Sequence, residues 1–196
     1  FITTTGLGEI PSGVELGVER IAVGDVVVVS GTLGDHGVAV MSQRAGIAFE
    51  TEIVSDSAPL HDLVARMLPR VPSLHAMRDP TRGGLAATLN EIAAARGVGI
   101  ALRADRLPVR DGVNAACELL GLDPLHVANE GKLVAICPPD AAEALLAAMR
   151  AHPLGRDAAV AGTVAAGPPG LVELETGFGG RRVVDWLGGD QLPRIC

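Results

Sequence analysis

Blocks of apolar residues with two different spacings alternate along the chain, and they predict an alternation of strands and helices. The β-branched run within 21–30 follows a Gly24-Asp25 turn and is typical of a buried strand. Between 59 and 68, apolar residues recur at spacings of three and four, as on one face of a helix. By the same criteria we expect strands at 98–102, 132–137, 160–165, 171–175 and 182–185, and helices at 38–44, 85–97, 113–120 and 140–149. This order indicates an α+β fold in which helices cover a sheet.

The stretch 79–84, Asp-Pro-Thr-Arg-Gly-Gly, lies in a predicted loop before the helix at 85–97. Asp79 or Thr81 can cap that helix, while Gly83 and Gly84 leave backbone N–H groups uncovered at its positive end, which suits an oxyanion or a phosphate. Arg82 adds a bidentate donor. The alternative interpretation is an ordinary cap and turn.

A second glycine-rich loop, residues 31–37, connects the first strand to the helix at 38–44. It includes Asp35 and His36, but it has no lysine of the Walker type, so it indicates a phosphate site more weakly. Two interpretations of His36 remain, an acid–base group and a plain loop residue.

A third polar loop, Asn129-Glu130-Gly131-Lys132, immediately precedes a predicted buried strand. Glu130 is a candidate general base or hydrogen-bond acceptor. Lys132 is the single lysine of the chain, and it can pair with Glu130 across the turn or neutralise a phosphate. The alternative is a simple polar turn.

The three cysteines have no metal-ligand spacing, and their wide separation favours reduced thiols in a cytoplasmic protein. Cys117 and Cys137 lie in apolar runs and are predicted to be buried. Cys196 is the last residue, at the end of a predicted flexible tail at 188–196. Either this thiol moves between sites as a nucleophile, or the chain simply ends in cysteine.

Composition excludes several classes of function. The net charge of −7 argues against a nucleic-acid groove, and an aromatic content of 2% provides no base-stacking platform. The uncharged stretch 158–172 is too short for a membrane span and is broken by glycine and proline. Because the sequence starts at Phe1, we expect three parts: 1–20, a linker from an upstream portion; 21–187, the folded domain; and 188–196, the tail.

Four segments together resemble the HypE family of hydrogenase maturation proteins. They are DPTRGGLAATLNEIA at 79–93, GDHG at 34–37, ACELLGLDPLHVANEGK at 116–132 and the terminal QLPRIC at 191–196. The resemblance covers the whole chain, and the loop at 79–84 is shared with the wider superfamily of aminoimidazole ribonucleotide (AIR) synthetase, selenophosphate synthetase and thiamine-phosphate kinase. It implies a PurM-like AIR synthase C-terminal domain, with a mixed, mainly antiparallel sheet of about four strands covered by helices.

The resemblance also implies a reaction. In the family, HypF loads a carbamoyl group onto the terminal cysteine, ATP with Mg²⁺ drives its dehydration to a thiocyanate, and the cyano group passes to iron on a HypC–HypD complex for nickel–iron hydrogenase. By this resemblance Cys196 is the carrier thiol and Glu130 abstracts an amide proton. The remaining candidates would line the substrate and phosphate side: Asp35, His36, Asp79, Thr81, Arg82, Gly83, Gly84, Asn129 and Lys132.

The family's ATP- and magnesium-binding domain, through which it mainly forms homodimers, would precede Phe1. We therefore expect no intrinsic metal site in this chain and no activity from it alone. Two rival hypotheses remain. A selenophosphate synthetase-like kinase would not need the thiol of 193–196, Pro-Arg-Ile-Cys, and a non-catalytic docking module would present only a surface and a tail to HypF or HypC–HypD.

Overall fold

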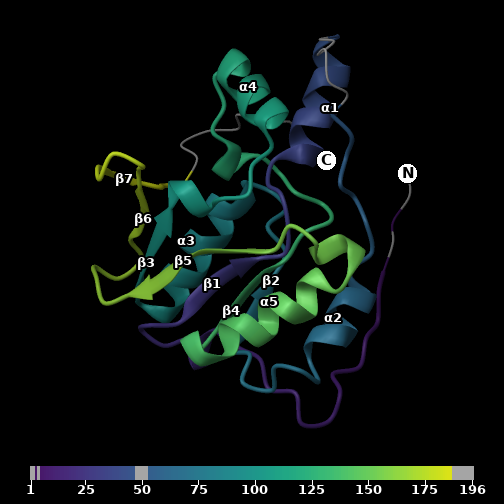
Figure 1. Cartoon of the computed structure of the whole chain (residues 1–196), viewed down its shortest axis with the longest axis vertical. Helices are drawn as coiled ribbons and strands as arrows, with labels where there is room; N and C mark the ends of the chain where they lie inside the picture. The colour runs from purple at the N-terminus through teal and green to yellow at the C-terminus, as the bar shows by residue number, and fades with distance from the viewer. Residues whose placement is uncertain (1–2, 4, 47–52, 187–196) are drawn as a thin grey trace.

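A mixed sheet of seven strands forms the centre of the computed structural model, which describes residues 3, 5–46 and 53–186 (Figure 1). The order across the sheet is β2-β4-β1-β5-β3-β6-β7. In chain order the strands are β1 Val26–Val29, β2 Ala76–Arg78, β3 Gly99–Arg103, β4 Val134–Cys137, β5 Ala159–Ala165, β6 Val172–Glu175 and β7 Arg181–Val183.

The expectation of about four strands was wrong, although the α+β class and the mainly antiparallel pairing are confirmed. The pairing of β3 with β6 is parallel, and the other pairings are antiparallel. The pattern of apolar residues missed only β2, a three-residue strand at the start of the predicted loop. Its sequence Ala-Met-Arg is too short to show alternation, and it forms by pairing with β4.

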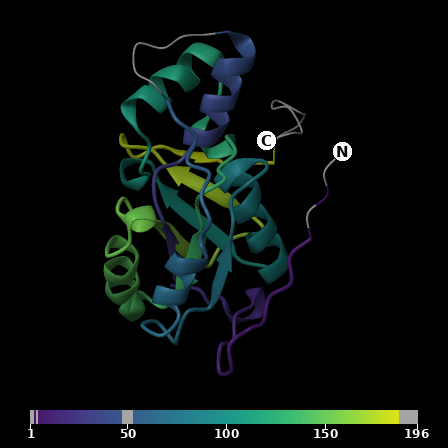
Figure 2. The same ribbon diagram turned by 90° about the vertical axis from the view of Figure 1, so that its right-hand side faces the viewer.

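Helices cover both faces of the sheet, as predicted. The strand β1 is buried on both sides, with Val27 and Val29 in one apolar cluster and Val26 and Val28 in the other. Helix α3, Gly84–Arg96, packs on the first face. Helices α2, His61–Met67, and α5, Ala142–Arg150, pack on the second. Figure 2 shows α3 and α5 on opposite sides of the strands.

Two further helices stand together beyond one edge of the sheet (Figure 1). Helix α1, Asp35–Ala45, begins three residues earlier than the predicted 38. It packs against α4, Asp111–Leu120, through a small apolar cluster that contains Val38, Val113 and Cys117. The short 3-10 segments are Val18–Arg20, Ala104–Arg106, Pro124–His126, Pro139–Ala141 and Pro153–Gly155.

The strand register brings the ends of β1 and β2 and the start of β4 to one side of the sheet. Val29 at the end of β1 and Arg78 at the end of β2 are both paired with Val134, the first residue of β4. The loops that follow β1 and β2 and the loop that precedes β4 therefore meet. Among the described residues, no helix is long and apolar enough to cross a membrane.

Candidate functional site

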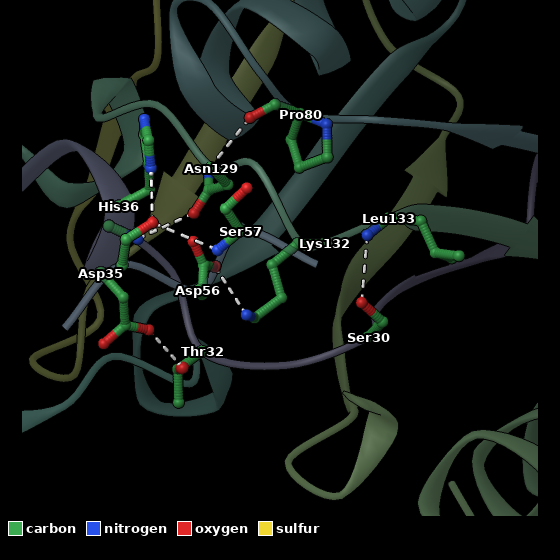
Figure 3. Close-up of polar contacts among 12 residues, drawn as sticks. Ser30, Thr32, Asp35, His36, Asp56, Ser57, Pro80, Asn129, Lys132 and Leu133 are labelled. Atoms are coloured by element: carbon green, nitrogen blue, oxygen red, sulfur yellow. Dashed lines mark hydrogen bonds and ion pairs between the residues drawn. The ribbon is translucent and has the colours of Figure 1, made fainter. Parts of the chain in front are cut away.

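The loops on this side of the sheet are the three that the sequence singled out, and a fourth segment, 55–58, joins them (Figure 3). The first loop, 31–34, ends at α1; the second, 79–83, ends at α3; and the third, 129–132, leads into β4. The structure thus brings most of the predicted site residues to one place.

Asn129 is the junction of the three predicted loops. Its side chain is completely buried, and its Oδ1 accepts a hydrogen bond of 2.8 Å from the Gly34 N–H. Its Nδ2 donates to the carbonyl oxygens of Pro80, at 3.0 Å, and Val127, at 3.1 Å. One amide therefore ties the segments that lead into α1 and α3 to the loop that carries Glu130.

We predict that Asn129→Ala lowers the free energy of unfolding by about 2–4 kcal/mol, because it leaves a buried donor and two buried acceptors without their partner. Urea denaturation of the purified protein measures the change. The matched control is Asn114→Ala at an exposed position of α4, where we expect less than about 0.5 kcal/mol. A loss below about 1 kcal/mol for Asn129→Ala would show that water or neighbouring groups replace the amide.

The N-terminal end of α1 holds two buried polar side chains. The Asp35 carboxylate accepts a hydrogen bond from the Thr32 hydroxyl, and its other oxygen lies 3.5 Å from an Arg110 nitrogen. The Nδ1 of His36 lies 2.8 Å from the hydroxyl oxygen of Ser55. The His36 Nε2 is buried and has no hydrogen-bond partner among the described residues. His36 is therefore held in place by one nitrogen and has the other available.

Lys132 does not pair with Glu130, which excludes the first of the two interpretations of this lysine. Its ammonium lies 2.6 Å from Oδ2 of Asp56, and the two side chains are only 10% and 9% exposed (Figure 3). A sequence separation of 76 residues hid this partner. In the sequence, the Ser-Asp-Ser run at 55–57 marks a polar segment but does not indicate the partner of Asp56.

The loop before α3 does not use a side-chain cap, contrary to prediction. Its N-cap is Gly83 in the left-handed region, and no side chain bonds there. Gly84 also has a positive φ, of 63°, and a Cβ at this position would lie 2.5 Å from the Leu125 carbonyl oxygen. Only glycine fits this approach. Because the N-cap is Gly83 and no side chain bonds there, neither Asp79 nor Thr81 caps the helix.

The side chains of this loop differ in exposure. Asp79 is 63% exposed, with Oδ1 4.0 Å from the Arg78 guanidinium. Thr81 is half-buried, and its carbonyl oxygen accepts a hydrogen bond from the Gly84 N–H. Arg82 is exposed at the N-terminal end of α3. A guanidinium at that end is suited to bind an anion.

Glu130 is half-buried between two buried neighbours, Asn129 and Gly131. Its position on a fixed backbone is suitable for a base that must reach a substrate. Cys196 and the rest of the predicted tail lie outside the described residues. No group of three or more metal-binding side chains gathers within the part of the chain that the structure describes.

The two other cysteines are buried, as predicted. Burial raises the pKa of the Cys137 thiol to about 11, and the carboxylates of Asp25 and Asp140 contribute. Burial, followed by the charge of Asp123, likewise raises the pKa of Cys117 to about 11. Since the thiolate is the nucleophile, about one thiol in 1,000 is reactive at pH 8.

We therefore predict that iodoacetamide at pH 8 leaves Cys117 and Cys137 unmodified in the folded protein and modifies both in urea. Peptide mapping by mass spectrometry distinguishes the two states, and the ionised fraction of each thiol should rise about tenfold per pH unit until the pH reaches about 11. Fast modification of either thiol in the native protein at pH 8 would contradict this assignment.

A separate cavity of about 440 Å³ lies between the N-terminal segment 11–16 and the region 65–74 around the end of α2. None of its lining residues belongs to the four loops. It therefore takes no part in the candidate site.

Residues 22–174 match the protein family of AIR synthase related proteins, C-terminal domain. The chain is 64% identical to carbamoyl dehydratase HypE of Bradyrhizobium diazoefficiens over 197 residues, which cover 100% of this chain and 57% of that protein. It is 59% identical to carbamoyl dehydratase HypE of Azotobacter vinelandii over 196 residues, which cover 100% of this chain and 58% of that protein.

Solved structures show the same similarity. The crystal structure of Escherichia coli HypE matches with a TM-score of 0.91 and 44% identity, covering 96% of this chain and 58% of that chain. A structure of HypE in complex with ATP matches with a TM-score of 0.87 and 44% identity, covering 92% of this chain and 55% of that chain. The HypE–HypF complex matches with a TM-score of 0.85 and 43% identity, covering 89% of this chain and 57% of that chain. The chain therefore spans a little over half the length of the relatives it matches.

Proposed function

Because the chain belongs to the family of AIR synthase related C-terminal domains, and within it to the HypE carbamoyl dehydratases, we propose that it carries the thiol and the base of an ATP-dependent carbamoyl dehydratase. The observation that carries this proposal is the identity of 64% over a match that spans the whole chain. The product is the cyano group used in the maturation of nickel–iron hydrogenase.

The proposed reaction converts a thiocarbamate on Cys196 into a thiocyanate. The carboxamide oxygen attacks the γ-phosphorus of ATP, and ADP leaves. The carbon–oxygen bond then breaks, inorganic phosphate departs, and the nitrogen gives up its two protons as the carbon–nitrogen triple bond forms. Glu130 accepts one of these protons, a role worth about 10²–10⁴-fold in rate, and the departing phosphate takes up the other.

The residues around Glu130 are suited to the phosphate side of this reaction. Arg82 and the N-terminal end of α3 provide a cation and backbone dipoles, while Lys132 adds a second cation. The buried His36 Nε2 is a polar atom in need of a partner. We propose that ATP and Mg²⁺ are held mainly by the part of the full-length protein that corresponds to the remaining length of the relatives, which include HypE solved with ATP.

The proposed partners follow from the same relatives. HypF would load the carbamoyl group, in keeping with a solved HypE–HypF complex. A HypC–HypD complex would accept the cyano group on iron, and a homodimer would form through the nucleotide-binding part. We propose that 21–187 is one domain, that 1–20 links it to that part, and that 188–196 moves the thiol between loading, dehydration and transfer.

A second candidate is docking without catalysis, in which these residues only present a surface and the tail. The similarity to a chain solved in complex with HypF favours a docking role. A pull-down with HypF and with HypC–HypD, compared with an ATP-binding titration, separates docking from catalysis. Binding of the partners without ATP binding or turnover by the full-length protein would favour this candidate.

The decisive experiment is intact-mass analysis of the full-length protein incubated with HypF and carbamoyl phosphate, with and without ATP in a second step. We expect the mass of one carbamoyl group to be gained, followed by the loss of one water only when ATP is added in the second step. A carbamoyl adduct that never loses water would refute the dehydratase proposal, whereas the absence of any adduct would refute the role of the thiol.

A further inference from the structure

The segment 55–58 contacts two of the three predicted loops at once. Its Ser55 hydroxyl oxygen lies 2.8 Å from Nδ1 of His36, in the first turn of α1 directly after the first loop, and 3.2 Å from the Ser57 backbone nitrogen, which donates to it. The next residue, Asp56, holds Lys132 in the third loop (Figure 3). This segment is therefore a structural part of the site rather than a connection that passes near it.

The backbone of this segment also touches the loop that carries Glu130. A Cβ on Gly131 would collide with the Asp56 carbonyl oxygen and would lie 3.0 Å from the Ala58 nitrogen. Gly131 is the residue between Glu130 and Lys132, so the segment contacts the third loop by its backbone and by the Asp56 side chain. The Asp56 backbone therefore packs directly against the backbone next to Glu130, with room only for a glycine between them.

Stability alone is a weak reason for this ion pair. Removing two charges from water costs several kcal/mol per ion, and a buried pair recovers that cost only with good geometry and satisfied remaining atoms. Here Oδ1 of Asp56 is buried and has no hydrogen-bond partner among the described residues. The ammonium of Lys132 has one hydrogen bond within the same part of the chain, to Asp56, out of the three it can donate.

The stem of Lys132 is confined as well. A Cβ on Gly31 would lie 2.9 Å from its Cε, so the first loop passes directly over the side chain. Asp56 at one end and Gly31 along the stem leave the ammonium little freedom. The cost of orienting a charge is then met during folding rather than during the reaction.

We propose that Asp56 is a positioning residue, which acts through Lys132 to fix a buried ammonium and the backbone of Glu130 beside the reacting carboxamide. This inference rests on the proposed dehydratase function. The ammonium stabilises negative charge as phosphate leaves the carbon, and Asp56 determines where that charge lies. Asp56 itself contacts neither the carboxamide nor the phosphate.

The test is a double-mutant cycle in the full-length protein, with Asp56→Asn, Lys132→Met and the two combined. Single-turnover conversion of the carbamoylated protein to the thiocyanate is followed by intact mass at several ATP concentrations. We expect each single variant to slow the rate at saturating ATP about 100-fold, since misplacement of a catalytic group by about 1 Å has an effect of that size. The half-saturating ATP concentration should change less than about threefold.

The combined variant distinguishes positioning from simple support of the fold. Without Lys132, Asp56 has nothing to position, so Asp56→Asn should slow Lys132→Met no further. The combined variant also removes both buried charges, so its melting temperature should recover toward that of the wild type while its rate stays low. Asp56→Glu, which keeps the carboxylate, should restore part of the rate, and Asp62→Asn on the exposed side of α2 is the matched control.

Three outcomes would overturn the inference. One is a rate that follows melting temperature across all variants, so that the combined variant regains activity. Another is an Asp56→Asn variant that forms the thiocyanate as fast as the wild type. If the wild type converts fully in that experiment, the dehydratase proposal stands and only the role of Asp56 is refuted. The third is a wild type that gains a carbamoyl group and never loses water, which removes the proposed function and this inference with it.

Discussion

Cys196→Ser is expected to abolish formation of the thiocyanate completely. A serine hydroxyl ionises far less readily than a thiol, whose free pKa is about 8.5, so the variant offers no comparable nucleophile for the carbamoyl group. The full-length variant, incubated with HypF, carbamoyl phosphate and ATP, should keep its original mass. ATP binding should remain, because the carrier thiol contributes nothing to holding the nucleotide in the proposed scheme.

The matched control is Cys117→Ala, which removes a thiol that is buried in the small cluster between α1 and α4. We expect this variant to acquire the carbamoyl group and to lose water as the wild type does, with at most a modest loss of stability. A carbamoyl adduct on the Cys196→Ser variant that still proceeds to a nitrile would disprove the assignment of the carrier. The docking hypothesis makes no such prediction, since a docking tail needs no sulfur chemistry.

Glu130→Gln is expected to slow dehydration of the carbamoylated protein by about 10²–10⁴-fold, because glutamine keeps the shape of the side chain and cannot accept the nitrogen proton. Loading of the carbamoyl group by HypF should be unchanged, so the adduct should accumulate. Intact mass at timed intervals after ATP addition gives the rate. The effect should fall on the rate at saturating ATP rather than on the ATP concentration required.

Two controls accompany this variant. Glu143→Gln, at an exposed position on α5, changes the same charge far from the four loops and should have no effect on the rate. Glu130→Asp keeps a carboxylate but shortens its reach, so an intermediate rate is expected. A Glu130→Gln variant that dehydrates within threefold of the wild type would transfer the role of base to another group, and His36 would be the next candidate.

The fold was largely predictable because its central elements have strong local patterns. The four consecutive valines of β1 can be buried on both faces only in the interior of a sheet, and helices do cover both faces. The predictions were wrong where the local sequence contains too little information about the structure. Strand β2 has three residues and depends on β4 for its existence, and the start of α3 depends on backbone geometry at Gly83 rather than on a capping side chain.

The site was predictable in its loops and less so in its pairings. Glycine, proline and polar residues mark the loops at 31–37, 79–84 and 129–132, and the strand register then brings them together. The partner of Lys132 could not be inferred from its neighbours, since Asp56 is 76 residues away in a polar stretch. The same applies to Arg110, which reaches Asp35 from the start of α4.

The sharing of Asn129 among three loops has a consequence for protein engineering. A designer who wished to graft this centre onto another scaffold, or to retune one loop for a different cargo, could not treat the loops as separate modules. Lengthening the turn before α1 or α3 by a single residue would pull the shared amide out of register with the other two. Sequence variation in this region should therefore occur as coordinated changes in the three loops. Libraries that diversify one loop at a time would yield mostly variants in which the site is disrupted.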